Sequence, residues 1–215
     1  RVLTDFSDVL FEILPELEPM HGFDQRNPHH DYDVYTHTLK TVAACPKDTV
    51  LRWAALLHDS GKPHTFTMDA RGGHFYGHAE ISAAIASRAL LSLKSDRKTH
   101  DTVVKLVKLH DNVWNGTDKQ LRRAVSKYGF EMTQMLLQIH HAEVAAQAEV
   151  HRAARVAESD RLLRMLEELR AADACMSLKD LAVSGSDLLE LGVPQGKGLG
   201  AYLNRLLDCV MPGYV

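Results

Sequence analysis

The sequence predicts an all-α fold, in which a helical bundle is followed by a small helical appendage at the C-terminus. Apolar residues recur at helical spacing almost throughout the 215-residue chain, whereas a half-buried strand would show strict alternation. β-Branched runs are short, and no low-complexity linker divides the chain. A chain of this length can bury a sizeable core without disulfides or a structural metal. We therefore expect any bound metal to serve chemistry.

Eight main helices are expected, with shorter ones after them. Asp48 can cap the helix that begins near residue 50. The segment 117–120 (Thr-Asp-Lys-Gln) is typical of a capping box that opens another helix. Proline and glycines over 62–77 indicate a loop or turn between helices. The expected helices cover residues 4–14, 31–45, 49–59, 78–93, 98–111, 118–128, 130–150 and 156–171.

The composition changes near residue 183, where glycines become closely spaced. We therefore expect a helical metal-binding domain over 1–182 and a small helical tail over 183–215. Within the tail, the glycine-rich segment 196–200 precedes an apolar helix. Its backbone amides could bind an RNA phosphate, or the segment could simply form the turn at a helix start. Both interpretations stay open.

The overall charge limits the class of partner. A net charge of −3 and a pI near 6.5 argue against a chain whose whole surface binds nucleic acid, since such domains are usually strongly basic. One basic stretch indicates either a solvated helix face or a phosphate-binding patch. It consists of Lys94, Arg97, Lys98, Lys105 and Lys108.

The three cysteines, Cys45, Cys175 and Cys209, are far apart and form no CxxC pair. We interpret them as reduced thiols of a cytoplasmic protein rather than as a disulfide framework or a zinc knuckle. No apolar run approaches the about 18 residues of a membrane span, and no basic-then-apolar signal pattern opens the chain. No membrane partner is therefore expected.

Five expected helices each place one polar, metal-competent side chain on their apolar face. A lone buried polar group costs a few kcal/mol unless it is paired or coordinated, and one such histidine is readily explained as a satisfied core residue. Five converging groups together with Asp59 are different, because each would need its own partner. One shared cation would satisfy all of them. The five residues are His37, His58, His78, His110 and Glu143.

The adjacent pair His58 and Asp59 ends an expected helix just before Gly61. Neighbouring side chains diverge by about 100° inside a helix, but at a helix end both can bend toward one ion. Imidazoles and carboxylates together suit Mn, Fe, Co, Ni, Zn or Mg and do not select among them. Lys62 is then either a cation that neutralises a phosphate near the metal or a surface lysine at the helix end.

This ordered set resembles the HD phosphohydrolase superfamily and, more closely, the HD-containing region downstream of the catalytic core in bacterial CCA-adding tRNA nucleotidyltransferases. The resemblance implies an all-α HD fold, the ligand set above and hydrolysis of phosphate esters, with cyclic phosphodiesterase, nucleotidase and phosphatase activities among its members. The segments that carry it are GFDQRNPHHDYDVYTHTL (22–39), LRWAALLHDSGKP (51–63), HFYGHAEIS (74–82), VVKLVKLHD (103–111) and DLLELGVPQGKGLGAYLNRLLD (187–208).

Two departures from the family pattern bear on function. The late acidic ligand is usually Asp, whereas this chain has Glu143, which is one methylene longer and can still coordinate. Nucleotidyl transfer needs paired aspartates on a strand beside a Gly-Ser turn to hold two Mg²⁺ ions, and Asp31-Tyr32-Asp33 lies in a helical context without that turn. We therefore expect no nucleotide addition by this chain alone. It is either the C-terminal part of a longer tRNA-processing enzyme or a free-standing relative.

The sequence thus predicts a metal-dependent phosphohydrolase that acts on phosphomonoesters or on cyclic or linear phosphodiesters of nucleotides or RNA ends, with tRNA as a further candidate partner. One or two divalent metal ions (Mn, Fe, Co, Ni, Zn or Mg) are expected as cofactors. The predicted metal ligands are His37, His58, Asp59 and Glu143 for a first ion, with His78 and His110 for a second ion or the substrate phosphate and Asp59 bridging. The predicted catalytic residues are Asp59, Lys62, His78 and His110.

Residues near these motifs carry weaker expectations. Asp33, one helical turn before the first ligand histidine, either orients that ring or is a plain surface aspartate. His29, His30, His64 and His74 lie near the motifs and are candidates for substrate contact.

Two other functions compete with hydrolysis. The first is a non-catalytic tRNA-binding body or tail module of a CCA-adding enzyme, in which the motif survives without activity. The second is a nucleotide-sensing HD protein of the guanosine-tetraphosphate or dNTP-hydrolase kind, although such proteins usually carry further recognisable motifs. A purely structural module has no need of six inward polar ligands, so retained metal would separate the first alternative from an enzyme.

Overall fold

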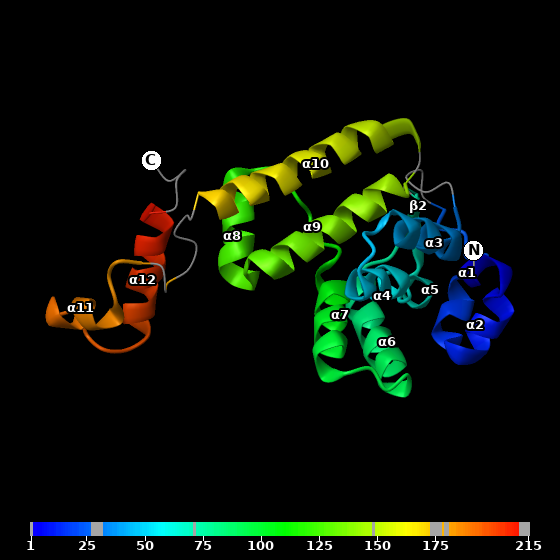
Figure 1. The fold of residues 1–215 in the computed structure, drawn as a ribbon, viewed down its shortest axis with the longest axis horizontal. Helices are drawn as coiled ribbons and strands as arrows, with labels where there is room; N and C mark the ends of the chain where they lie inside the picture. Colours follow the sequence, from blue (N-terminus) through cyan, green and yellow to red (C-terminus); the bar gives the residue numbers. More distant parts are fainter. Residues whose placement is uncertain are drawn as a thin grey trace. The chain divides into compact units, whose positions relative to one another are not determined.

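The structure, a computed structural model shown in Figure 1, covers most of the chain. Four residues discussed above lie outside the described ranges, namely His29, His30, Asp31 and Cys175. The described residues are 2–26, 32–70, 72–147, 149–172, 178 and 181–210.

The described residues are mostly helical, which confirms the predicted all-α class. Among the described helices, none is both long and apolar enough to cross a membrane. The elements in chain order are α1 (Val2–Asp5), α2 (Ser7–Ile13), the 3₁₀ helix η1 (Pro15–Met20), α3 (Val34–Ala44), α4 (Thr49–Leu57), α5 (Lys62–Thr65), β1 (Thr67–Asp69), β2 (Gly72–His74), α6 (His78–Ser92), α7 (Arg97–Leu109), α8 (Asp118–Tyr128), α9 (Phe130–Ala145), α10 (Glu149–Ala171), α11 (Gly185–Glu190) and α12 (Lys197–Val210).

The chain forms two compact units. Unit 1 comprises residues 1–113 and 135–160, and unit 2 comprises 114–134 and 161–215. Every predicted metal ligand and Lys62 lies in unit 1. The domain boundary expected after residue 182 stays a prediction.

The core of unit 1 is built on α4, which packs against α3 and α7, while α6 packs along α7 (Figure 1). Small residues such as Ala54, Ala86 and Ala89 are fully buried, so these helices can approach closely. Larger apolar side chains fill the remaining space between the helices. They include Leu51, Leu57, Ile85, Leu90, Val103, Leu106 and Val107.

The helix starts follow the expected capping chemistry. The Asp48 carboxylate accepts a hydrogen bond from Leu51 N at 2.9 Å, which confirms the predicted cap of α4. Thr117 caps α8 by accepting from Gln120 N at 3.3 Å. The reciprocal half of the predicted capping box does not form there, because Gln120 Oε1 accepts from Asn115 N at 2.7 Å.

A small β-hairpin lies inside the segment 62–77, where only a loop or turn was predicted. Strands β1 and β2 are antiparallel, with Thr67 opposite His74. Strands of three residues are too short to show alternation, so the sequence pattern could not predict them. A Cβ at Gly73 would lie 2.4 Å from the carbonyl oxygen of Gln25, which explains the glycine at this place.

Three predicted helices differ from the structure by more than a few residues or by a break. The helix expected over 4–14 is divided at Phe6 into α1 and α2. The helix expected over 130–150 ends earlier, at Ala145, and the one expected over 156–171 begins earlier, at Glu149. None of these differences changes the fold class, because the helical periodicity itself was correct.

Unit 2 contains a small helical pair at its C-terminal end. An ideal Cβ at Gly185 in α11 would lie 3.5 Å from Leu199 Cδ2 in α12, so the two helices pack closely. Leu199 N donates to Gly196 O at 3.1 Å in the turn that opens α12. The segment 196–200 therefore forms a helix start, and its binding to an RNA phosphate stays a prediction.

The basic stretch on α6–α7 carries its own ion pairs. Lys108 Nζ lies 3.0 Å from Glu80 Oε2, and Arg97 Nε lies 3.5 Å from Asp101 Oδ2. These contacts agree with the interpretation of a solvated helix face.

Cys45 ends α3, is 4% exposed and should be chemically inert in the folded protein. Burial raises the pKa of its thiol to about 11, so at pH 8 roughly one thiol in a thousand is ionised. We expect iodoacetamide at pH 8 to label the exposed Cys209 and to spare Cys45 until urea unfolds the protein. Peptide mass spectrometry measures both sites. Equal labelling in the folded state would contradict this burial.

Candidate metal centre

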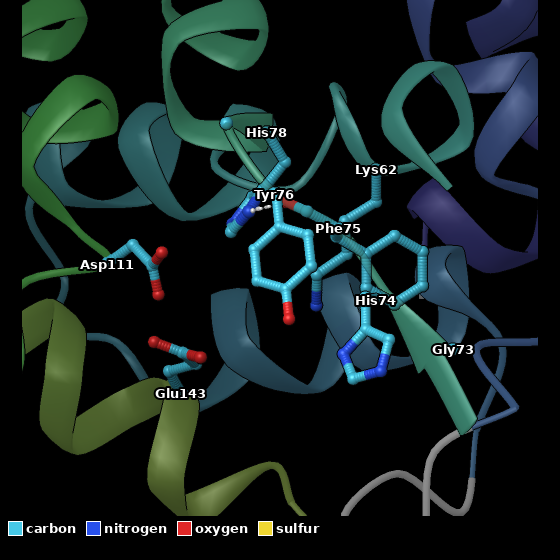
Figure 2. A pocket seen from close by; sticks show the side chains of 9 residues that line it. Lys62, Gly73, His74, Phe75, Tyr76, His78, Asp111 and Glu143 are labelled. Atoms are coloured by element: carbon cyan, nitrogen blue, oxygen red, sulfur yellow. Dashed lines mark hydrogen bonds between the residues drawn. The ribbon is translucent and has the colours of Figure 1, made fainter. Parts of the chain in front are cut away.

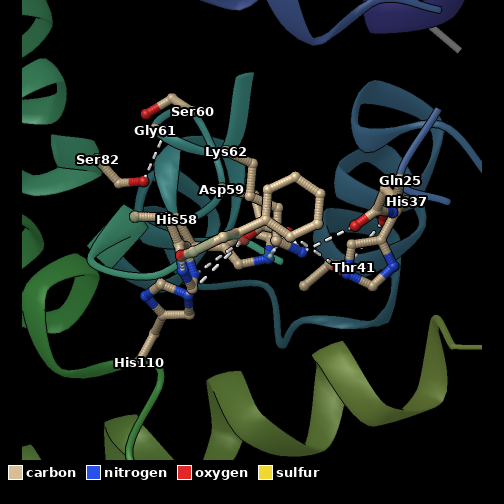
Figure 3. Close-up of polar contacts among 12 residues, drawn as sticks. Gln25, His37, Thr41, His58, Asp59, Ser60, Gly61, Lys62, Ser82 and His110 are labelled. Carbon is tan, nitrogen blue, oxygen red and sulfur yellow. Dashed lines mark hydrogen bonds and ion pairs between the residues drawn. The ribbon is translucent and has the colours of Figure 1, made fainter. Parts of the chain in front are cut away.

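Four helices of unit 1 supply the four predicted histidine ligands, and all four side chains are buried. His37 lies within α3, and His78 is the first residue of α6. His58 and His110 are the residues at which α4 and α7 end. Asp59 therefore follows the end of α4, where it can turn into the same space (Figure 3).

Asp59 lies at the centre of these rings. Its Oδ2 is 3.2 Å from His58 Nε2 and 3.9 Å from His37 Nε2. Its Oδ1 is 3.5 Å from His78 Nε2 and 3.7 Å from His110 Nε2. Each carboxylate oxygen thus faces a different pair of imidazole nitrogens.

Backbone carbonyl groups set the tautomers of three of these rings. His58, His78 and His110 each donate from Nδ1 to the carbonyl oxygen three residues earlier, at 2.7, 2.9 and 2.6 Å. This places the proton on Nδ1 and leaves a lone pair on Nε2. His78 Nε2 and His110 Nε2 lie only 3.1 Å apart. Two lone pairs at that distance repel unless a proton or a metal ion lies between them.

The ligand atoms form two groups, within each of which they lie within 4.8 Å of one another. Although His58 Nε2 lies 3.2 Å from Asp59, it makes no well-directed hydrogen bond within the described part of the chain. A buried polar atom left in this state costs about 1–3 kcal/mol, which coordination would remove. The donor set therefore fits a divalent ion. One group is His37, His58 and Glu143, and the other is Asp59, His78 and His110.

Both carboxylates of the centre are held in their charged form. Burial alone would raise the pKa of Asp59, but His58 and Lys62 outweigh it and the pKa lies well below its usual value. Desolvation also acts to raise the pKa of Glu143, and His58 and His110 again outweigh it, so this pKa is lowered as well. The centre thus offers negative charge to a cation.

The imidazoles respond to burial in two ways. Burial lowers the pKa of His37 to about 4, although the charge of Asp59 partly opposes it. Burial lowers the pKa of His78 against the same opposition. At His110 burial also acts to lower the pKa, but the contact with Asp59 outweighs it and the pKa is raised. The rings of His37 and His78 are therefore neutral near pH 7, as metal ligation requires.

Lys62 is buried and holds Asp59 in place. Its Nζ lies 2.7 Å from Asp59 Oδ2 and donates to Gln25 Oε1 at 2.9 Å (Figure 3). Gln25 is fully buried and donates to Tyr32 O at 3.1 Å, so it fixes the lysine in turn. Sequence reasoning did not single out Gln25, because an uncharged side chain in a loop gives no periodic signal.

Gly61 allows the start of α6 to approach Asp59. Its N–H donates to Ser82 Oγ at 2.8 Å, and a Cβ at this position would lie 2.4 Å from the carbonyl oxygen of His78. Gly77, directly before α6, has a φ of 76°, a conformation that glycine adopts without strain. The two glycines together place His78 beside the carboxylate.

A cavity of about 310 Å³ adjoins the centre (Figure 2). Three predicted site residues line it, namely Lys62, His78 and Glu143. Two residues that were not predicted also line it, Tyr76 and Asp111. Asp111 follows His110 as Asp59 follows its own histidine, and this second His-Asp pair was a signal in the sequence. Tyr76 gave no comparable signal.

The weaker expectations have mixed outcomes. Asp33 caps α3, because its two carboxylate oxygens accept from Thr36 N and Gly22 N, each at 2.6 Å. It therefore acts as a helix cap rather than by orienting a ligand ring. His64 is exposed on α5, whereas His74 lines the cavity.

A predominantly helical unit that gathers imidazoles and carboxylates around one buried aspartate is the arrangement expected of a helical metal-binding domain. Comparison with known families agrees, since the HD domain family model matches residues 34–165. The chain belongs to the HD domain family. This confirms the resemblance and the helical fold that it implied.

Two curated proteins that resemble this chain over most of its length are named tRNA nucleotidyltransferases, and a third that resembles half of it is named a Multifunctional CCA protein. The A-adding tRNA nucleotidyltransferase of Deinococcus radiodurans is 31% identical over 94% of this chain and 48% of its own length. The CC-adding tRNA nucleotidyltransferase of Thermus thermophilus is 30% identical over 94% of this chain and 46% of its own length. The Multifunctional CCA protein of Azoarcus sp. is 37% identical over 51% of this chain and 27% of its own length. The chain thus spans about half the length of the first two relatives.

Proposed function

We propose that this chain is a divalent-metal-dependent phosphohydrolase module of the kind found with tRNA nucleotidyltransferases. Its substrates would be phosphomonoesters or cyclic or linear phosphodiesters of nucleotides or RNA ends. The observation that most supports this function is the position of Asp59, which lies within 4 Å of four imidazole Nε2 atoms and contacts Lys62 and His78, two residues that line the cavity.

The proposed ligands and Lys62 would have different roles. Of the six proposed ligands, His37, His58 and Glu143 form one group of ligand atoms, and the remaining three form a second group around the Asp59 carboxylate. A divalent ion held there supplies positive charge and lowers the pKa of water, which provides a nucleophile near neutral pH. Lys62 lines the cavity, and the positive charge of its ammonium group would stabilise the phosphoryl oxygens of a bound substrate. The hydrogen bonds at Nδ1 keep the histidine rings aimed at the centre.

A metal-reconstitution panel tests this proposal. The chain is stripped with a chelator, supplied separately with Mn, Fe, Ni, Co, Mg or Zn, and assayed with a nucleoside monophosphate, a 2′,3′-cyclic nucleotide and a linear phosphodiester. We expect hydrolysis to return with at least one ion and to be absent from the stripped protein. A parallel elemental analysis should find metal in the protein as purified. The proposal is wrong if the chain shows no hydrolysis and retains no metal under any of these conditions.

The relatives also support a second function, that of a non-catalytic tRNA-binding module, because two of them are tRNA nucleotidyltransferases by name. In that case the chain should bind tRNA in a gel-shift titration and hydrolyse none of the three substrates. The tRNA-processing relatives and the free thiols of Cys45 and Cys209 support a cytoplasmic location for either function.

A further inference from the structure

Tyr76 presents an exposed aromatic ring at the cavity beside the metal centre. The residue is 73% exposed, although tyrosine is a large side chain with mostly apolar surface. Its ring stacks on His74 with the centroids 5.3 Å apart and the planes 9° from parallel. Figure 2 shows the Tyr76 ring with the Asp111 and Glu143 carboxylates on one side and His74 on the other. One face of the tyrosine is therefore covered, and the high exposure leaves the opposite face open to solvent.

The backing of this ring is fixed by the hairpin. His74 is the last residue of β2, and its Nε2 lies at hydrogen-bonding distance, 2.9 Å, from Asp69 Oδ1 at the end of β1. Phe75, the next residue, packs against Phe66 with the ring centroids 5.5 Å apart. The stacked pair is thus held in place through His74 itself and through Phe75, the residue between its two members.

The position along the chain links this ring to the centre. Tyr76 is separated only by Gly77 from His78, which is one of the proposed ligands. A single exposed aromatic residue needs no explanation in itself. This ring differs because it is rigidly backed, lines the cavity and lies two residues from the buried cluster.

We propose that Tyr76, backed by His74, is a stacking platform for the base of a nucleotide whose phosphate lies at the metal centre. The ligand class is a nucleoside phosphate, either free or as the terminal residue of an RNA. Aromatic rings stack on any base and so give affinity without sequence preference. A cavity of about 310 Å³ lies at the lower end of the range for small-molecule sites, which is about 300–1,000 Å³. That size suits a single nucleotide. The position of the phosphate rests on the proposed function, whereas the contact with the base does not.

A binding experiment tests the platform without relying on turnover. The ligands are the phosphonate analogues of AMP and of ribose 5-phosphate, in which a carbon–phosphorus bond resists hydrolysis. Calorimetry on the Mn²⁺-loaded chain measures both dissociation constants. We expect the adenosine compound to bind at least about tenfold more tightly, which is typical of one stacked base. No preference for the compound with a base would overturn the inference.

Variants separate stacking from a structural role. Tyr76→Leu keeps an apolar side chain without a ring and should reduce the preference roughly tenfold. Tyr76→Phe keeps the ring and should retain the preference. Phe6→Leu removes an exposed aromatic ring elsewhere in unit 1 and serves as the matched control. If Tyr76→Leu weakens both ligands equally, the residue only supports the fold and the inference is wrong.

Two further comparisons assign the source of the nucleotide and separate this inference from the proposed function. The wild-type chain and Tyr76→Leu are each titrated with a short RNA that ends in a 2′,3′-cyclic phosphate and with the free cyclic nucleotide. The ligand that the wild type binds more tightly, and whose binding Tyr76→Leu weakens, identifies the source of the nucleotide. Base-dependent binding without any hydrolysis in the metal panel would support the platform and refute the phosphohydrolase. Hydrolysis without base preference would support the phosphohydrolase and refute the platform.

Discussion

Replacing Asp59 with asparagine should abolish hydrolysis and release the bound metal while leaving the helical content unchanged. Asparagine keeps the shape of the side chain but removes the charge that faces four imidazoles. Loss of a group that only orients a ligand costs about 10–100-fold, so loss of a shared ligand should exceed about 100-fold in kcat/KM. The helices should persist because the amide oxygen can still accept from Lys62. Kinetics, elemental analysis and circular dichroism measure the three effects.

The matched control is Asp101→Asn, the same exchange on an exposed aspartate of α7 whose carboxylate pairs with Arg97 and His100 of the same helix. Its activity and metal content should equal those of the wild type. Full activity in Asp59→Asn would show that the proposed centre is not the catalytic one. Loss of metal from both variants would mean that the effect is not specific to the buried carboxylate.

Gly61→Ala is expected to damage both stability and the centre. The added methyl group would lie 2.4 Å from His78 O and 2.7 Å from Ser82 N, which are backbone atoms that cannot rotate away. The start of α6 must therefore shift, and overpacking of this kind costs about 1–3 kcal/mol in the free energy of unfolding. Because the shift moves His78 away from Asp59, metal affinity should fall as well. Urea denaturation and metal titration measure the two losses.

Gly200→Ala provides the comparison for that exchange. Gly200 is exposed within α12, and an added methyl group would meet nothing within 4 Å. Alanine there should be neutral or should stabilise the protein by up to about 1 kcal/mol. If Gly61→Ala unfolded at the same urea concentration as the wild type, the close approach of α6 would be wrong.

The sequence predicted the parts of the molecule that depend on periodicity. Each main helix buries one face, so its apolar stripe is visible in the chain, and a polar residue on the stripe, such as His37 or His110, is visible as an interruption. The structure brings all six predicted ligand residues together in two groups. Metal binding by these residues stays a proposal, since geometry alone does not test it.

The features that the sequence did not predict depend on contacts between segments far apart in the chain. Gln25 reaches Lys62 from a loop 37 residues earlier, and no local pattern encodes that distance. The hairpin is too short to alternate, and the role of Gly73 depends on the backbone that passes beside it. Tyr76 is exposed, so it leaves no trace in a hydrophobic pattern.

The three Nδ1 hydrogen bonds connect each ring to its own stretch of backbone, within three residues, rather than to a side chain on another element. The aim of the His58 and His110 rings is therefore encoded locally and does not rely on residues that line the cavity, whereas His78 is held by Phe75, which does line it. Exchanges of the Tyr76 or Asp111 side chain can consequently change which molecule fits without loosening the rings of His58 and His110. In such an arrangement, selectivity and the core chemistry can change independently of each other.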